Sequence, residues 1–240
     1  MSGRRYLLVD DNVEFAENLA EILRDEGAAV DCAHHGEAAL EAVARARYDA
    51  VVTDMRMPGM SGAQLLRRLR AVDHAVPVVL LSAFAQDAQV TDARRDGLLA
   101  VLSKPQQVPK LLDLLARARR GGVVLVEDDA ALCDNLAEVL TARGITVVVA
   151  GHLAEVEAIG VKPVAALVDL KVPGGDLGAA LESVRRRFPQ TPTVVITAFG
   201  DQAPHHEVFH KPFDTGALVA RVEELFAAMA PAPGKVEGPP

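Results

Sequence analysis

The segment VVTDMRMPGMSG, residues 51–62, begins as an apolar strand and ends that strand on an aspartate, Asp54, shortly before a Pro-Gly turn. The segment ALVDLKVPGGD, residues 166–176, repeats the pattern around Asp169. A short run of apolar and β-branched residues that stops at a turn is typical of a buried strand in a parallel sheet. Since such sheets bind ligands outside the carboxyl ends of their strands, the pattern predicts chemistry at two equivalent positions.

The rest of the chain contains the same duplication. Three further pairs of segments recur in the same order: YLLVDDNVEFAENLAEIL (6–23) with VVLVEDDAALCDNLAEVL (123–140), VVLLSAF (78–84) with TVVITAF (193–199), and SKP (103–105) with HKP (210–212). Four ordered matches at spacings of 107 to 117 residues indicate an internal repeat of one structural unit. The chain is therefore expected to consist of two copies of one domain.

Each copy alternates short β-branched runs with helical periodicity, as in a parallel sheet flanked by helices. In the first copy the expected strands span 6–9, 28–33, 49–54, 77–82 and 98–103. Asn12 is expected to cap the helix that follows the first strand. Five strands and five helices in about 120 residues match a flavodoxin-like domain. The predicted fold is α/β, with two tandem (βα)5 doubly wound domains whose parallel five-stranded sheets have the strand order 2-1-3-4-5.

The expected boundaries are 1–120 for the first domain and 121–229 for the second, with a tail at 230–240. The tail is rich in proline and glycine, which predicts disorder. The segment RARRGG, 117–122, is interpreted as a short linker, and its arginines as a solvated helix end. The short linker predicts two closely coupled domains.

Composition narrows the class of protein. The chain has 240 residues, a net charge of −8 and two cysteines. The negative charge argues against direct binding of nucleic acid or an anionic membrane. Two distant cysteines fit a reducing compartment, and no apolar run is long enough for a signal peptide or a membrane span. We expect a cytoplasmic protein.

Polar residues end the expected strands of the first copy. Asp10 and Asp11 follow the first strand, Asp54 ends the third, Ser82 ends the fourth and Lys104 follows the fifth. The first and third strands are neighbours in this fold, so three carboxylates should meet at one edge. Two carboxylates 4 Å apart repel by about 4 kcal/mol at an effective dielectric of 20, so a cation should be present. An all-oxygen site suits Mg²⁺, or Mn²⁺ in its place.

With a metal ion and a lysine beside it, an aspartate can attack phosphorus and carry an acyl phosphate. On these residues both halves resemble the receiver domains of two-component response regulators. The resemblance implies that Asp54 is a phosphoacceptor, that Lys104 binds the phosphate, and that the Lys104–Pro105 bond is cis. The other roles it implies in the first half are Mg²⁺ ligands at Asp10, Asp11, Asp54 and the Arg56 carbonyl, a switch hydroxyl at Ser82, and a phosphate-binding backbone at Ala83.

The same resemblance extends to the second half, with Asp169 as its phosphoacceptor. Its Mg²⁺ ligands would be Glu127, Asp128, Asp169 and the Lys171 carbonyl, and its phosphate would be bound by Thr197, Lys211 and the backbone of Ala198.

Three features depart from the receiver pattern. Receivers often carry an aromatic residue three positions before the lysine, but these positions hold Val101 and Val208. Ser82 and Lys104 are 22 residues apart whereas Thr197 and Lys211 are 14 apart, so the fourth helix of the second domain, near 200–210, should be absent or much reduced. The residue eight after the acceptor is Gly62 in the first copy and Leu177 in the second, which should alter that turn.

The resemblance implies a response regulator made of two receivers, rather than an enzyme acting on a separate substrate. A sensor histidine kinase or a histidine phosphotransfer protein would phosphorylate Asp54, Asp169 or both. The phosphorylated domains would change their affinity for a downstream protein. A second copy of this chain is another candidate partner.

Other interpretations remain open from the sequence. The chain could be a phosphorelay intermediate or a phosphate sink that passes phosphate to a histidine phosphotransfer protein. It could be a scaffold that is never phosphorylated, or the second domain alone could have lost phosphorylation. A phosphohydrolase of the haloacid dehalogenase type also uses a strand-end aspartate, but it needs a second acid two residues later, where this chain has Arg56 and Lys171.

Overall fold

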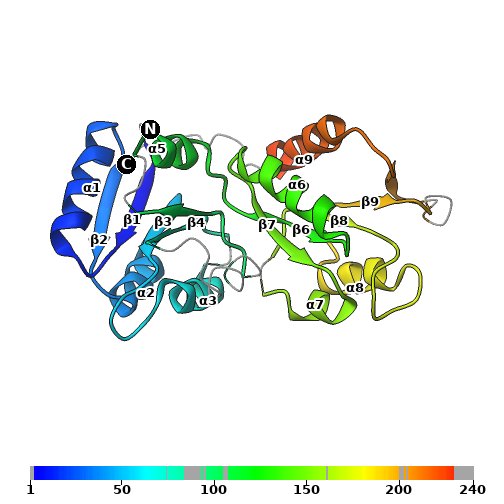
Figure 1. The fold of residues 1–240 in the computed structure, drawn as a ribbon, viewed down its shortest axis with the longest axis horizontal. Coiled ribbons are helices and arrows are strands. Elements are labelled where there is room, and N and C mark those ends of the chain that lie inside the picture. Colours follow the sequence, from blue (N-terminus) through cyan, green and yellow to red (C-terminus); the bar gives the residue numbers. More distant parts are fainter. Residues whose placement is uncertain are drawn as a thin grey trace, which may run out of the picture.

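The computed structural model describes residues 3–73, 75–83, 93, 96–104, 108–160, 162–199, 203 and 205–229. It contains two five-stranded parallel sheets, each flanked by helices (Figure 1). The predicted tail at 230–240 and the predicted cis bond between Lys104 and Pro105 lie outside the described residues. In the second half, the Lys211–Pro212 bond is cis.

The first sheet has the strand order β2-β1-β3-β4-β5. The elements of this domain are β1 (Arg5–Val9), α1 (Val13–Asp25), β2 (Ala29–Ala33), α2 (Gly36–Arg45), β3 (Ala50–Asp54), α3 (Gly62–Val72), β4 (Val78–Ser82), β5 (Ala100–Ser103) and α5 (Val108–Arg117). The predicted strand order is confirmed, and each predicted strand lies within two residues of an observed one.

The second sheet has the order β7-β6-β8-β9-β10, which is the same topology. Its domain comprises β6 (Gly122–Val126), α6 (Ala130–Thr141), β7 (Thr146–Ala150), α7 (Leu153–Ala158), β8 (Ala165–Val168), α8 (Ala179–Arg187), β9 (Thr193–Thr197), β10 (Glu207–His210) and α9 (Thr215–Met229). No helix among the described residues of the chain is long and apolar enough to span a bilayer.

Each sheet is buried on both faces, which explains why its strands read as continuous apolar runs. In the first domain, alternate residues of one strand enter different cores: Val51 packs with α2 and α3, while Val52 packs with α1 and α5. Burying one such side chain contributes about 1.5–3 kcal/mol. Helix α1 starts where predicted, because the Asn12 side chain accepts a hydrogen bond from the Phe15 amide at 3.0 Å.

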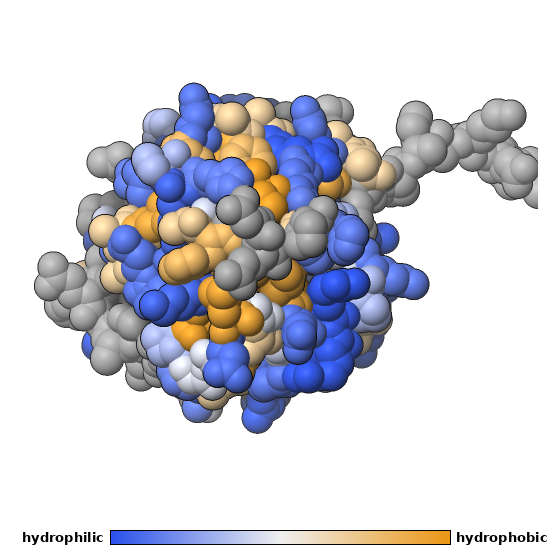
Figure 2. Space-filling view, turned by 90° about the vertical axis from the view of Figure 1, so that its right-hand side faces the viewer, coloured by the Kyte–Doolittle hydropathy of each residue, from blue (hydrophilic) through white to orange (hydrophobic). Residues whose placement is uncertain are grey.

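The predicted loss of the fourth helix in the second domain is confirmed. Only residues 198–206 connect β9 to β10, and those that the structure describes form no helix. Ala203 from this connection is buried in the same cluster as Val195, so its small side chain helps to cover the sheet there. Figure 2 views this end of the molecule and shows apolar residues between hydrophilic ones.

The linker after α5, residues 118–121, is bonded to the first domain at the amino ends of its strands. The Gly121 amide donates to the Ala75 carbonyl at 2.7 Å, and the Arg120 guanidinium contacts the Asp73 carboxylate and the Tyr48 carbonyl. Arg120 was expected to be a solvated helix-end residue. That expectation is wrong, because its side chain is mostly buried against two loops of the first domain.

The linker is also bonded to the second domain. The Arg119 amide donates to the Gly144 carbonyl at 2.8 Å, and its guanidinium lies 3.5 Å from the Glu223 carboxylate on α9. Gly144 packs so closely against the end of α5 that a Cβ there would lie 2.0 Å from the Arg117 carbonyl oxygen. The two domains are therefore joined by specific contacts at the amino ends of both sheets.

We predict that Gly144→Val changes the arrangement of the domains, whereas Gly27→Val does not. Both glycines follow equivalent helices with positive φ, 76° and 85°, so both variants carry a similar local cost of about 1–2 kcal/mol. The Gly144 variant also collides with the end of α5, where a Cβ would lie 2.0 Å from the Arg117 carbonyl oxygen. Small-angle scattering should show a larger radius of gyration for Gly144→Val than for Gly27→Val. Superimposable profiles for the two variants would contradict this role of Gly144.

Candidate functional site

The residues singled out in the first domain meet at the carboxyl edge of the first sheet. The Lys104 Nζ atom lies 2.8 Å from Asp10 Oδ2 and 2.6 Å from Asp54 Oδ1. Both carboxyl groups are buried, with residue exposures of 4% and 8%. Backbone amides satisfy their other oxygens, since Asn12 donates to Asp10 at 2.9 Å and Arg56 donates to Asp54 at 2.8 Å. Two buried acids from different strands thus share one cation.

The position of Lys104 is fixed by its surroundings. Its amide donates to the carbonyl of Ser82 at 2.8 Å, and its ammonium lies 4.4 Å from the centre of the Phe15 ring. Burial lowers the pKa of Lys104, but hydrogen bonds and charge from Asp10 and Asp54 outweigh it and raise the pKa above the usual lysine value. The lysine therefore stays charged at neutral pH, and its stabilising effect is lost only as the pH rises through that raised pKa.

The remaining predicted residues of the first site differ in exposure. Ser82 is buried at the end of β4, whereas Asp11 and Ala83 are exposed. Phe15, whose ring faces the Lys104 ammonium, was not identified from the sequence as a site residue. Its place in the first turn of α1, directly after the acidic pair, is the signal that could have identified it.

The second domain repeats the ion pair. The Lys211 Nζ atom lies 2.6 Å from Glu127 Oε2 and 2.7 Å from Asp169 Oδ2. The amides of Asp129 and Lys171 donate to these two carboxylates at 3.1 and 3.2 Å. The amide of Lys211 donates to the Thr197 carbonyl at 3.0 Å, as Lys104 does to Ser82. Both predicted sets of residues are thus brought together by the same strand ends.

Burial changes the titration of the second pair. Burial raises the pKa of Glu127 above its usual value, although Lys211 and the Asp129 amide lower it in part. For Lys211, burial lowers the pKa, but Asp169 and Glu127 outweigh it and leave the pKa raised. The fully buried Thr197 hydroxyl accepts a hydrogen bond from the Phe199 amide at 3.2 Å, and Ala198 is exposed.

The donor atoms of the second site fit a hard cation. Oxygens of Glu127, Asp128 and Asp169 lie within 4.8 Å of one another, and carboxylate oxygens are the ligands that Mg²⁺ prefers. Among the described residues this is the single group of that kind, so Asp10, Asp11 and Asp54 of the first domain are not equally close together. Arg56 and Lys171, whose carbonyls were predicted as metal ligands, donate their backbone amides to the carboxylates of Asp54 and Asp169.

The loop after Asp169 is one residue longer than the loop after Asp54. In the first domain the Gly62 amide donates to the carbonyl of Met55, the residue after Asp54. In the second domain Gly178, rather than Leu177, donates to the equivalent carbonyl of Leu170. The predicted alteration of this turn is confirmed: Gly178 takes the place of Gly62, and the side chain of Leu177, just before it, is exposed.

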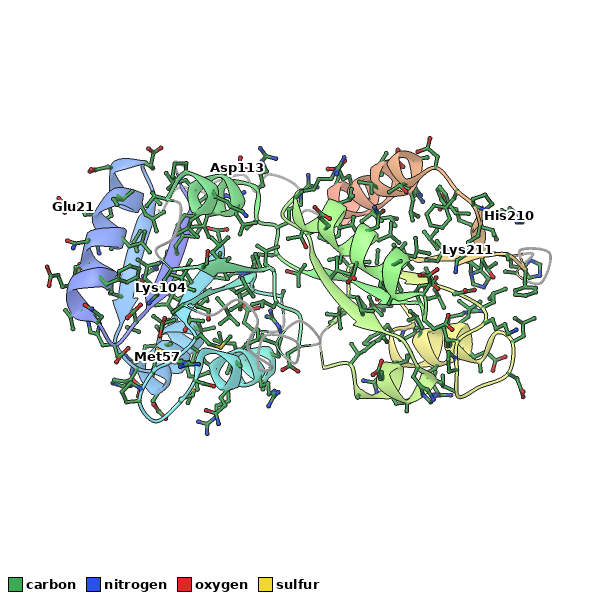
Figure 3. The ribbon with its side chains drawn as sticks, in the orientation of Figure 1. Glu21, Met57, Lys104, Asp113, His210 and Lys211 are labelled. Atoms are coloured by element: carbon green, nitrogen blue, oxygen red, sulfur yellow. The ribbon has the colours of Figure 1, made fainter. Side chains whose placement is uncertain are left out.

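The two sites lie far apart along the molecule, with Lys104 in the left half of Figure 3 and Lys211 toward its right end. The reason is topological, since the linker contacts loops that precede strands in both sheets and the sites lie at the opposite, carboxyl ends.

Comparisons with known proteins agree with this geometry. Residues 6–116 match the family model described as the response regulator receiver domain. The chain is 51% identical over 226 residues to the response regulator receiver protein Anae109_2439 of Anaeromyxobacter sp. strain Fw109-5, which covers 92% of this chain and 95% of that protein. The chain belongs to the response regulator receiver family.

Two further receiver proteins are similar to about half of this chain, which is the length of one receiver domain. Sporulation initiation phosphotransferase F of Bacillus subtilis is 28% identical over 117 residues, 49% of this chain and 94% of that protein. A solved receiver domain of the sensor histidine kinase PA1611 from Pseudomonas aeruginosa PAO1, with magnesium coordinated in its active-site cleft, is 30% identical. The match covers 48% of this chain and 97% of the solved chain, with a TM-score of 0.45.

We predict that Lys211→Met destabilises the second receiver-like domain by about 2–3 kcal/mol at pH 8, because two buried carboxylates lose their shared cation. The loss should be smaller at pH 5. Since the folded-state pKa of Glu127 is raised, protonation at low pH favours the folded state and relieves the repulsion. Urea unfolding followed by circular dichroism measures both values.

Lys171→Met is the matched control for this prediction. It removes the same charge from the same edge of the sheet, but Lys171 is exposed and its ammonium lies 5.9 Å from the Phe199 ring centre. It should change stability by no more than about 0.5 kcal/mol. Equal effects of the two variants, or a larger loss for Lys211→Met at pH 5 than at pH 8, would contradict the shared ion pair.

Proposed function

We propose that both domains are receivers, with boundaries near 1–120 and 121–229, and that Asp54 and Asp169 each accept a phosphoryl group. The observation that carries this proposal is the repeated ion pair: in each domain one lysine lies between a buried strand-end aspartate and a second buried acid. The donor is a sensor histidine kinase or a histidine phosphotransfer protein. Phosphorylation then changes the affinity of the chain for a downstream protein.

The reaction is a transfer from nitrogen to oxygen. An oxygen of Asp54 or Asp169 attacks the phosphorus of a phosphohistidine, the P–N bond breaks, and the leaving imidazole takes a proton from solvent. Lys104 and Lys211 hold the added negative charge because both are positioned at the acceptor oxygens. The hydroxyls of Ser82 and Thr197, and the backbone amides of Ala83 and Ala198, bind phosphoryl oxygens.

A divalent cation completes the proposed sites. Glu127, Asp128 and Asp169 hold it in the second domain, and Asp10, Asp11 and Asp54 hold it in the first, with the Arg56 and Lys171 carbonyls as further ligands. When bound, Mg²⁺ or Mn²⁺ neutralises charge that develops on the transferred phosphoryl group. The close group of three oxygens in the second domain supports this assignment.

The proposed switch differs from one based on an aromatic side chain. Val101 and Val208, three residues before the lysines, are only half-buried valines. A movement of the hydroxyl residues toward a phosphoryl group therefore acts on the loops after β4 and β9 without a ring to relay it. Since the described residues between β9 and β10 form no helix, we propose that the output surface of the second domain lies elsewhere than on a fourth helix.

The same residues do not favour hydrolysis of a separate substrate. A haloacid dehalogenase-type reaction needs an acid two positions after the nucleophile, and those positions hold Arg56 and Lys171. We therefore propose that the chain promotes only its own phosphorylation and dephosphorylation, in the cytoplasm.

Intact-mass measurement after incubation with acetyl phosphate and Mg²⁺ tests the proposal. The unmodified chain should gain two phosphoryl groups, Asp54→Ala and Asp169→Ala one each, and the double variant none. Asp113→Ala, which changes an exposed aspartate on α5, is the control and should still gain two. Phosphorylation of the double variant would contradict the assigned acceptors, and an unphosphorylated Asp54→Ala chain would exclude Asp169.

A further inference from the structure

An aromatic ring of the first domain lies against the cation of its site. The Lys104 ammonium lies over the Phe15 ring, with Nζ 4.4 Å from the ring centre. An ammonium within about 6 Å of a ring centre is attracted by the negative face of the ring. The side chain of Lys104 is only 25% exposed, so water screens this attraction less than it would at an open surface.

The ring adds a third contact to an ammonium that two acids already bind. Lysine has three N–H donors, and Nζ of Lys104 lies 2.8 Å from the Asp10 carboxylate and 2.6 Å from the Asp54 carboxylate. These two contacts alone leave the flexible lysine chain free to turn about the line between the acids. The Phe15 ring approaches from helix α1 and restricts that movement.

The ring is itself held in place. The amide of Phe15 donates to the Asn12 side chain at 3.0 Å, in the cap that begins α1. The half-buried side chain of Phe15 packs against the core cluster that contains Leu19 and Leu111. A ring fixed by a helix cap and by the core can hold the ammonium without competing for either acid.

The second domain has the same backbone arrangement with a different side chain. The Asp129 side chain accepts a hydrogen bond from the Leu132 amide at 3.1 Å, as Asn12 does from Phe15. Leu132 therefore takes the place of Phe15 in the repeat. Leucine has no π face, so at this position it contributes packing but no attraction for a cation.

We infer that Phe15 is a positioning residue for the phosphorylation of Asp54 and acts through Lys104. This rests on the proposed function. The ammonium must meet the charge that the phosphoryl group brings to Asp54, and a cation already held in place loses little freedom in doing so. An aliphatic side chain in place of the ring keeps the packing of α1 but leaves the ammonium to the two acids alone. Phosphorylation of Asp54 is then slower.

The experiment uses the full chain carrying Asp169→Ala, so that Asp54 is the acceptor followed. Acetyl phosphate with Mg²⁺ is the donor, so that no protein surface takes part, and intact mass gives the initial rate. Phe15→Leu should lower this rate by about threefold to tenfold. Phe15→Tyr keeps a ring and should stay within about twofold of the parent. If the role of Phe15 were packing alone, leucine would be tolerated at least as well as tyrosine, whose hydroxyl adds volume.

A second measurement reports the contact itself. In ¹³C-lysine-labelled protein without metal, the ring should shift the Cε protons of Lys104 upfield, and Lys104→Arg identifies their signal. The shift should persist in Phe15→Tyr and be lost in Phe15→Leu. Phe188→Leu is the matched control, because it removes another half-buried ring, one that lies 5.4 Å from the Arg187 guanidinium in the second domain. It should change neither the Lys104 signal nor the rate at Asp54.

Three outcomes would overturn the inference. These are equal labelling rates for the parent and Phe15→Leu, equal losses of rate in the leucine and tyrosine variants, and a Lys104 signal that Phe15→Leu leaves unmoved. A parent chain that acetyl phosphate does not label would contradict the proposed function at Asp54, and the inference would fall with it. The two failures are distinguishable, because only the second is seen in the parent.

Discussion

The lysine that lies between two buried carboxylates is the contact on which each site depends. Carboxylates about 4 Å apart repel by about 4 kcal/mol at an effective dielectric of 20, and burial adds a desolvation cost. Lys104 offsets this repulsion between Asp54 and Asp10, and Lys211 offsets it between Asp169 and Glu127. The same cation that makes the acidic pair compatible with folding is also placed to hold the charge of a phosphoryl group.

The strand order makes this ion pair possible. Strands β1 and β3 are adjacent, so the residues that end them are neighbours, while the lysine reaches across from β5 beyond β4. The amide of Lys104 is fixed to the carbonyl of Ser82 at the end of β4, and that of Lys211 to Thr197. The strand-end aspartate, the hydroxyl residue and the lysine of each domain therefore belong to one edge of its sheet, although they are far apart in sequence.

Much of this arrangement could be predicted because it depends on periodicity and repetition. Strand ends are recognisable in the sequence, and the carboxyl ends of parallel strands share one edge, so the grouping of Asp54, Ser82 and Lys104 follows from topology. The extra residue in the loop that leads from Asp169 to Gly178 could not be located in advance, because a loop insertion leaves no periodic signal. The role of Arg120 was also missed, since its partners Asp73 and Tyr48 are distant in sequence and only the folded chain brings them together.

The linker adds a constraint that neither domain carries alone. It is bonded to the amino ends of both sheets, through Arg120 and Gly121 on one side and Arg119 on the other. Because every strand in both sheets runs away from it, the two carboxyl edges face away from each other. The proposed acceptors Asp54 and Asp169 therefore lie on edges that face away from each other. Under the proposed function, this arrangement makes Asp54 and Asp169 separate inputs to one chain.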